Sequence, residues 1–279
     1  MIKITTDSTC DLPKSLLEKH QISVMPLGVL KGERLYHDGV DICPADIAAH
    51  VDAGGEITTT SAVNIADYEA LYQKVTAEYE AQIHLNIGSG FSSCYQNAKI
   101  PSVDYPTVHV VDTENLSAGH GALVLAAAEA AEAGRSAEEI VALLKDMIPR
   151  VELSFVLDRL DYMKKGGRCS AVTALGANLL KLHPCIEVMD GKLSVTKKYR
   201  GSTEKCVADY VRERLANRED LDTSRIIVVD TCEDSHLADI ALDIIREDGR
   251  FGEVIVNKAG CTIFSHCGPN VLGLMLLKK

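Results

Sequence analysis

Residues 84–98, HLNIGSGFSSCYQNA, place a short apolar strand, a Gly-Ser-Gly turn and the start of a helix in direct succession. The N-terminus of a helix carries backbone N–H groups without partners and the positive end of the helix dipole. Glycines before it let the backbone approach a ligand closely, so such a turn can hold an anion. No Lys or Arg follows before Lys99. The stretch therefore favours a single carboxylate over a polyphosphate, with Ser92 and Ser93 as nearby hydroxyl groups.

Strands and helices alternate along the first part of the chain. The patterns indicate strands at 1–6, 22–30, 84–87 and 108–112, and helices at 13–19, at 44–51, from Asn64, from Ser92, at 117–133 and from Ser136. Asn64 is a suitable N-cap, and Ser136 with Glu139 has the pattern of a capping box. This alternation predicts a parallel α/β sheet, whose ligands bind beyond the carboxyl ends of the strands. Ser92 falls at such an end, and Thr60 is a second candidate.

The regular alternation of predicted strands and helices ends at about residue 150. Strands are expected at 153–157, 186–189, 192–198, 225–230, 253–257 and 262–264, and helices at 204–215 and 237–245. Asp190-Gly191 between two of these strands is a strong hairpin signal. A hairpin requires antiparallel neighbours, so we expect a mixed sheet in this part. The predicted fold is α/β with two domains: an N-terminal parallel α/β domain over 1–150, and a C-terminal mixed-sheet α/β domain over 151–279.

Composition narrows the class of protein. The net charge of −11 argues against nucleic acid as the main partner, because phosphate binding needs clustered basic surface. The longest apolar stretch, 121–128, is well short of the ~20 residues that a membrane span needs. The nine cysteines form no CxxC pair, so neither a zinc site nor a thioredoxin-like redox pair is indicated. Cys261 and Cys267 flank His266 and could be metal ligands, but free cysteines are more often small buried apolar residues. The sequence shows no signal peptide, and we expect reduced thiols in a cytoplasm.

Three further groups of residues have both a functional and a structural interpretation. Thr60 and Ser61 could donate to a carboxylate or cap the helix that follows. His266, in SHCGPN, could give a hydrogen bond or a positive charge to a carboxylate, or be a turn histidine with local partners. The basic residues of 164–168 and the pair at 198 and 200 could hold a phosphate or a partner, or be solvated surface.

An enzyme is the main alternative to a binding protein. Ser92 could be the nucleophile of an esterase or thioesterase with His266 as its base. The segment Gly90-Phe91-Ser92-Ser93-Cys94 departs from the GxSxG pattern at its last position, and no acidic residue is identifiable as the partner of His266. The chain also lacks GxxxxGK[ST] and GxGxxG, so a nucleotide would have to come from another protein. A lipid-sensing regulatory protein is a further alternative.

Taken together and in order, six short motifs make the chain resemble the DegV family over essentially its whole length. These are bacterial proteins that bind fatty acids, and they include the fatty-acid-binding subunit of a bacterial fatty acid kinase. The motifs are Asp7-Ser8-Thr9, Thr60-Ser61, Ser92 with Tyr95-Gln96, Lys165-Gly166-Gly167-Arg168, Lys198 with Arg200, and His266 with Gly268-Pro269.

The resemblance implies a carrier that binds a long-chain fatty acid between two α/β domains, with no cofactor and no catalysis of its own. The carboxylate would meet the hydroxyls of Thr60 and Ser92 with His266 close by, and Ser61 and Ser93 complete our candidate set. The acyl chain would run into an apolar tunnel in the second domain, with residues 171–182 as part of its wall. A separate ATP-dependent fatty acid kinase would then make an acyl-phosphate.

That kinase or the phosphate would meet a basic set of residues. The candidates are Arg168, Lys198 and Arg200.

Three short segments depart from the family's usual pattern. Ala62-Val63 replaces Gln-Pro, Ser93-Cys94 replaces Gly-Thr, and Asn270 replaces the last glycine of Gly-Pro-Gly. Since Ser93 keeps its backbone N–H, anion binding is expected to survive the second change. The loss of Gln-Pro is expected to change the shape of the loop. A changed loop would in turn alter the position of the carboxylate or the preferred chain length of the fatty acid.

Overall fold

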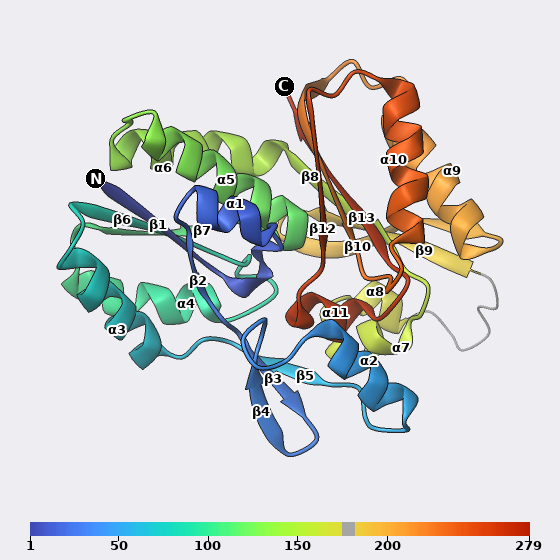
Figure 1. Ribbon diagram of the computed structural model, residues 1–279, viewed down its shortest axis with the longest axis horizontal. Coiled ribbons are helices and arrows are strands. Elements are labelled where there is room, and N and C mark those ends of the chain that lie inside the picture. Colours follow the sequence, from blue (N-terminus) through green and yellow to red (C-terminus); the bar gives the residue numbers. More distant parts are fainter. Residues whose placement is uncertain (175–181) are drawn as a thin grey trace.

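Three sheets form the framework of the computed structural model, which describes residues 1–174 and 182–279 (Figure 1). The first is a four-stranded sheet in the order β2-β1-β6-β7, and all of its neighbouring strands are parallel. Its strands are β1 (Ile2–Asp7), β2 (Ser23–Met25), β6 (Ala81–Asn86) and β7 (Val108–Asp112). This confirms the parallel sheet that was predicted for the N-terminal part.

Helices cover both faces of the parallel sheet. α5 (Ser117–Glu132) and α6 (Ala137–Met147) lie on one face, and α3 (Ile65–Thr76) and α4 (Cys94–Lys99) lie on the other (Figure 1). The predicted caps are present: the backbone N–H of Asp67 donates to Asn64 at 2.9 Å, and Ser136 with Glu139 forms a capping box. Short helices α1 (Lys14–Lys19), η1 (Ser8–Cys10), η2 (Pro101–Asp104) and η3 (Ile148–Arg150) complete this part.

A small antiparallel sheet in the order β4-β3-β5 projects below the parallel sheet in Figure 1. It consists of β3 (Gly28–Lys31), β4 (Arg34–His37) and β5 (Thr59–Ser61), and α2 (Pro44–Asp52) lies in the connection from β4 to β5. The single strand predicted over 22–30 is therefore two strands in different sheets. Pro26 lies between them and has no N–H to donate to a ladder, which explains the break.

The third sheet has six strands in the order β10-β9-β8-β13-β11-β12 and is mixed, because only β11 and β12 run parallel. Its strands are β8 (Val151–Val156), β9 (Leu182–Met189), β10 (Lys192–Arg200), β11 (Leu221–Asp230), β12 (Glu253–Lys258) and β13 (Leu272–Lys278). Helices α9 (Thr203–Leu215) and α10 (His236–Asp248) lie together on one side of it (Figure 1). The mixed sheet and the hairpin at Asp190-Gly191 are confirmed.

Helix α5 packs against both large sheets, with β1 and β6 on one side and β8, β11 and β13 on another. Most of its residues from Ser117 to Ala130 are buried, which leaves no wide polar face. A helix that is enclosed on all sides has apolar residues around its whole circumference. This explains the run of alanines in α5. The division into domains over 1–150 and 151–279 stays a prediction.

One predicted strand is wrong. Residues 262–264 lie in a helix, α11 (Cys261–Cys267), and the strand that enters the sheet is β13 further on. A short apolar run does not distinguish a buried strand from a buried helix. Here the helix is favoured by Asp38, which accepts hydrogen bonds from the first two backbone N–H groups of α11. The two remaining helices are α7 (Asp161–Gly166) and α8 (Ser170–Thr173). No helix among the described residues is long and apolar enough to cross a bilayer.

Candidate functional site

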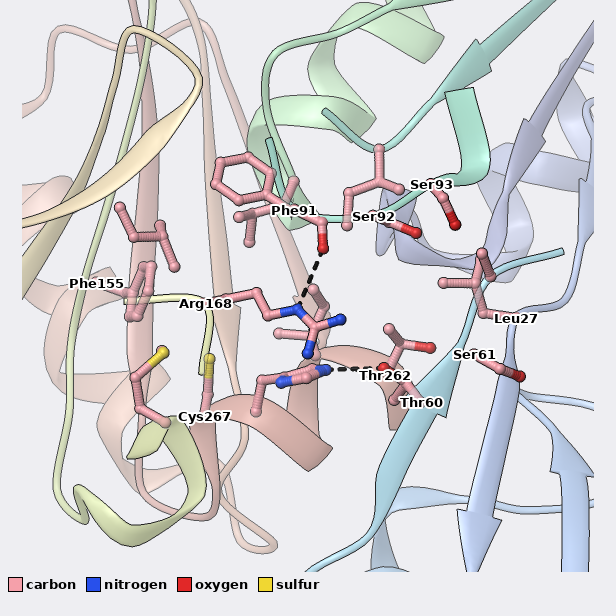
Figure 2. Close-up of a pocket in the computed structure, with 17 residues that line it drawn as sticks. Leu27, Thr60, Ser61, Phe91, Ser92, Ser93, Phe155, Arg168, Thr262 and Cys267 are labelled. Carbon is pink, nitrogen blue, oxygen red and sulfur yellow. Dashed lines mark hydrogen bonds between the residues drawn. The ribbon is translucent and has the colours of Figure 1, made fainter. Parts of the chain in front are cut away.

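A cavity of about 100 Å³ lies where the parallel sheet, the small sheet and the mixed sheet meet (Figure 2). Its polar lining comes from the candidate residues of four separate segments, and apolar side chains complete it. The lining residues are Leu27, Thr60, Ser61, Ala62, Ile87, Phe91, Ser92, Ser93, Leu116, Phe155, Met163, Arg168, Leu193, Thr262, Ile263, His266 and Cys267. The structure thus brings all five carboxylate candidates of the sequence to one cavity.

The loop from Gly88 to Ser93 follows β6 and is fixed by carboxylates at the ends of the neighbouring strands. The backbone N–H of Ile87 donates to Asp7 at 2.7 Å, and that of Ser89 donates to Asp112 at 3.0 Å. Both carboxylates are the last residues of their strands, so the carboxyl edge of the sheet holds the loop. The sequence placed an anion site here but gave no role to these two carboxylates.

Ser92 lies just before α4 and faces the cavity (Figure 2). Its hydroxyl donates to Cys94 Sγ at 3.2 Å and accepts from the Cys94 backbone N–H at 3.3 Å. Thiol sulfur is a weak acceptor. A carboxylate oxygen in the cavity would be a stronger acceptor for the same hydroxyl, because hydrogen bonds to ionised groups are about twice as strong.

Thr60 and His266 are hydrogen-bonded to each other in the wall of the cavity: Thr60 Oγ1 lies 2.8 Å from His266 Nε2 (Figure 2). The other ring nitrogen, Nδ1, is buried and has no hydrogen-bond partner among the described residues. It faces Gly166, where an added Cβ would lie only 2.2 Å away. Burial and the nearby Arg168 lower the pKa of His266 to about 4. The imidazole is therefore neutral at neutral pH and contributes a hydrogen bond rather than a positive charge.

The tautomer of His266 decides what Thr60 can do. A proton on Nδ1 would face Gly166 with no acceptor, whereas a proton on Nε2 is used by Thr60. We therefore assign the proton to Nε2, which donates to Thr60 Oγ1. The hydroxyl proton of Thr60 is then free to donate to a ligand oxygen.

Arg168 supplies a positive charge to the cavity, although the sequence suggested it only for docking a partner or a phosphate. Its guanidinium donates to the carbonyl oxygen of Phe91 at 3.3 Å (Figure 2). It also donates to the carbonyl oxygen of Gly166 at 2.7 Å. It follows Gly167, which ends α7 in the left-handed conformation with φ of 66°. Arg168 is exposed, so solvent reaches this side chain beside the cavity.

Lys198 and Arg200 do not line the cavity. Both are exposed on β10, an edge strand of the mixed sheet. Their role as a docking site stays a prediction.

A smaller, mainly apolar cavity of about 20 Å³ adjoins the first one. The two cavities share Leu116, Phe155, Ile263 and Cys267 as lining residues. The smaller one reaches further along the mixed sheet, past Leu153, Val229, Ala259, Val271 and Gly273. Ser117 and Thr231 also line the smaller cavity, and its other lining residues are apolar.

The tunnel wall predicted over 171–182 falls largely on residues 175–181, which lie outside the described residues, and for them it stays a prediction. The described remainder of that stretch lines neither cavity. Among the described residues, Phe155 and Leu116 line both cavities. Sequence reasoning missed them because buried apolar residues of a strand and a helix start carry no signal for a ligand.

The fold and the cavities define an α/β protein in which a cavity lined by hydroxyl groups, His266 and Arg168 adjoins a smaller, mainly apolar cavity. Comparison with known proteins gives the family: the family model described as "Uncharacterised protein, DegV family" matches residues 1–279. A DegV domain-containing protein of Clostridium acetobutylicum is 32% identical over 282 residues, covering 100% of this chain and 99% of the relative. The chain belongs to the DegV family.

Solved structures agree with this assignment. A fatty-acid-binding DegV family protein from Thermus thermophilus superposes with a TM-score of 0.92 at 28% identity, covering 100% of this chain and 99% of that one. A stearic acid-binding protein from Eubacterium ventriosum gives a TM-score of 0.87 at 25% identity, with the same coverage of both chains.

Proposed function

We propose that this chain is a cytoplasmic carrier of a long-chain fatty acid, which it binds between the two predicted domains and presents to a separate kinase. The observation that carries the proposal is the junction of a polar anion site with an apolar cavity. Solved relatives that bind fatty acids support it. The proposal requires neither a cofactor nor a metal.

The carboxylate is held by hydroxyl groups and by one charge. Thr60 and Ser92 each donate a hydroxyl proton, and Ser61 and Ser93 lie on the same cavity wall. Arg168 neutralises the carboxylate charge from the solvent side, a role that the guanidinium group suits because it is always protonated. His266 acts through Thr60, whose orientation it fixes.

The acyl chain follows the apolar cavities toward Gly273. Each methylene that leaves water contributes about 0.8 kcal/mol, so the tail dominates affinity and the carboxylate contacts set orientation. A cavity of ~150 Å³ holds benzene. The larger cavity, at about 100 Å³, therefore cannot enclose a long tail unless its lining side chains move. Binding is thus coupled to displacement of residues such as Phe155.

Presentation to a kinase is the finer part of the proposal. The kinase supplies ATP and transfers its terminal phosphoryl group to the bound carboxylate, giving an acyl-phosphate. Lys198 and Arg200 are exposed on an edge strand and so are accessible to such a partner. Arg168 lies at the solvent side of the cavity, where the phosphoryl group would arrive.

The geometry favours binding over ester hydrolysis. His266 Nε2 is paired with Thr60 rather than with Ser92, and no carboxylate among the described residues orients Nδ1. A serine hydrolase needs the base on the nucleophile and an orienting group on the base. The hydroxyl of Ser92 donates to Cys94 instead.

One set of titrations tests the proposal. Isotopically labelled [1-¹³C]palmitate is added to the delipidated protein, and the carboxyl resonance is followed by NMR. We expect a bound resonance in slow exchange that broadens or shifts in Arg168→Gln. A carboxyl signal that stays at the free position would exclude the site. The isolated protein is also incubated with an acyl ester, and turnover that depends on Ser92 would support the esterase instead.

Addition of a cognate kinase with ATP separates the carrier from a lipid sensor. The carrier is expected to yield acyl-phosphate under these conditions. Bound fatty acid that is never phosphorylated would support the sensor.

A further inference from the structure

Helix α11 contributes four residues to the cavity, yet its start is held by a distant part of the chain. The carboxylate of Asp38, in the loop after β4, accepts the Cys261 backbone N–H at 2.7 Å and the Thr262 backbone N–H at 3.0 Å. The hydroxyl of Ser8 donates to the same carboxylate at 3.1 Å. Asp38 is buried, so these hydrogen bonds are shielded from water.

A second buried carboxylate supports the first. Asp11 accepts the Gly260 backbone N–H at 2.8 Å and the Ser117 hydroxyl at 2.6 Å. Gly260 fits between the two carboxylates, since a Cβ there would lie 3.2 Å from an oxygen of each. Residues 260–262 therefore donate three consecutive backbone N–H groups to two side chains of the N-terminal part.

The other end of α11 carries His266, and its side chains are hydrogen-bonded to the segment that contains Thr58 and Thr60. Ser265 Oγ lies 2.7 Å from Thr58 Oγ1, and His266 Nε2 lies 2.8 Å from Thr60 Oγ1. The helix has seven residues, so a shift at its first turn is transmitted to the next. The two hydrogen bonds from this start to the Asp38 carboxylate are charge-assisted and complement the helix dipole, which makes them the stronger end of this attachment.

We propose that Asp38, supported by Asp11, is a positioning residue of the carboxylate site. It fixes α11 so that His266 Nε2 meets Thr60 Oγ1 and leaves the Thr60 hydroxyl proton for the ligand. The expected effect of Asp38 on fatty acid affinity rests on the proposed function. Its effect on the position and tautomer of His266 does not, because it is present in the ligand-free protein.

The test is Asp38→Asn in the full chain, with Asp41→Asn as its matched control. Asparagine offers one acceptor oxygen and places an amide N–H₂ against the second backbone N–H. Asp41 belongs to the same loop and also accepts a backbone N–H, from His37 at 2.5 Å, but makes no hydrogen bond to α11. Two readouts are taken: the ¹⁵N shifts of the His266 ring in delipidated protein, and the Kd for palmitate.

In the wild type and in Asp41→Asn we expect one tautomer, with a protonated Nε2 and an unprotonated Nδ1. In Asp38→Asn we expect the two nitrogen shifts to move toward each other, and the Kd to rise about tenfold. A folded Asp38→Asn protein with wild-type His266 shifts would overturn the proposal, as would the same change in Asp41→Asn. If the wild type binds no palmitate, the proposed function fails, and the His266 shifts still decide whether Asp38 is a positioning residue.

Gly260→Ala keeps the test decisive if Asp38→Asn does not fold. Its Cβ displaces both side chains by a few tenths of an ångström and removes neither of them. We expect the same direction of change in the His266 shifts, at smaller amplitude. Unchanged shifts in a folded Gly260→Ala protein would contradict the positioning role.

Discussion

Replacing Thr60 by valine removes one hydroxyl and keeps the shape of the side chain. In the free protein, His266 Nε2 loses its partner, and Nδ1 already has none among the described residues. An orphaned buried polar group costs about 1–3 kcal/mol, so the free energy of unfolding should fall by that amount. In the complex, the carboxylate loses a hydrogen bond to a charged group, worth about 1.5–3 kcal/mol. At 1.4 kcal/mol for each factor of ten, the Kd should rise by roughly 10- to 150-fold.

The assay pairs calorimetric titration of palmitate with urea unfolding of the delipidated protein. Thr60→Ser is the control, because it retains a hydroxyl at the same position and should keep affinity and stability near those of the wild type. A Thr60→Val protein that folds and binds palmitate with wild-type affinity would refute the assignment of Thr60 to the carboxylate.

Three further changes test other parts of the site. Ser92→Ala should weaken fatty acid binding by ~1–3 kcal/mol, and unchanged calorimetric affinity would remove Ser92 from the site. Gly273→Val should fill the smaller cavity and weaken binding of palmitate more than that of decanoate; equal losses would place the tail elsewhere. Burial, with Asp38 and Asp7 nearby, raises the pKa of Asp11 to about 8, well above its unfolded value of ~3.9. The folded state thus binds the extra proton, and this group's contribution to stability falls as pH rises from about 4 to about 8. The urea midpoint of Asp11→Asn should not show that decline. A pH profile of the midpoint identical to that of the wild type would contradict the raised pKa of Asp11.

The sequence predicted the elements whose signals are local. Asn64 and Ser136 cap their helices through residues three positions away, and Asp190-Gly191 turns a hairpin between adjacent strands. The class of fold follows from such elements, because alternating strands and helices form parallel sheets. The single strand predicted over 22–30 is two strands in the structure, and Pro26 alone was enough to predict this break.

Elements that depend on distant residues were not predictable in the same way. Helix α11 is capped by Asp38, 223 residues before Cys261, so its own short apolar sequence was ambiguous. Arg168 was recognised as basic but not as part of the cavity, since only the tertiary fold brings Phe91 and His266 beside it. The family resemblance grouped Ser92, Thr60 and His266, and the structure places all three at one cavity, whereas their hydrogen bonds needed the structure.

The most direct test of the central claim is native mass spectrometry of the full chain purified from cells, followed by lipid extraction. We expect a population of protein carrying the added mass of one fatty acid, which the extract then identifies. The same preparation of Thr60→Val should carry less of it. Wild-type protein with no bound fatty acid at any occupancy would contradict the account.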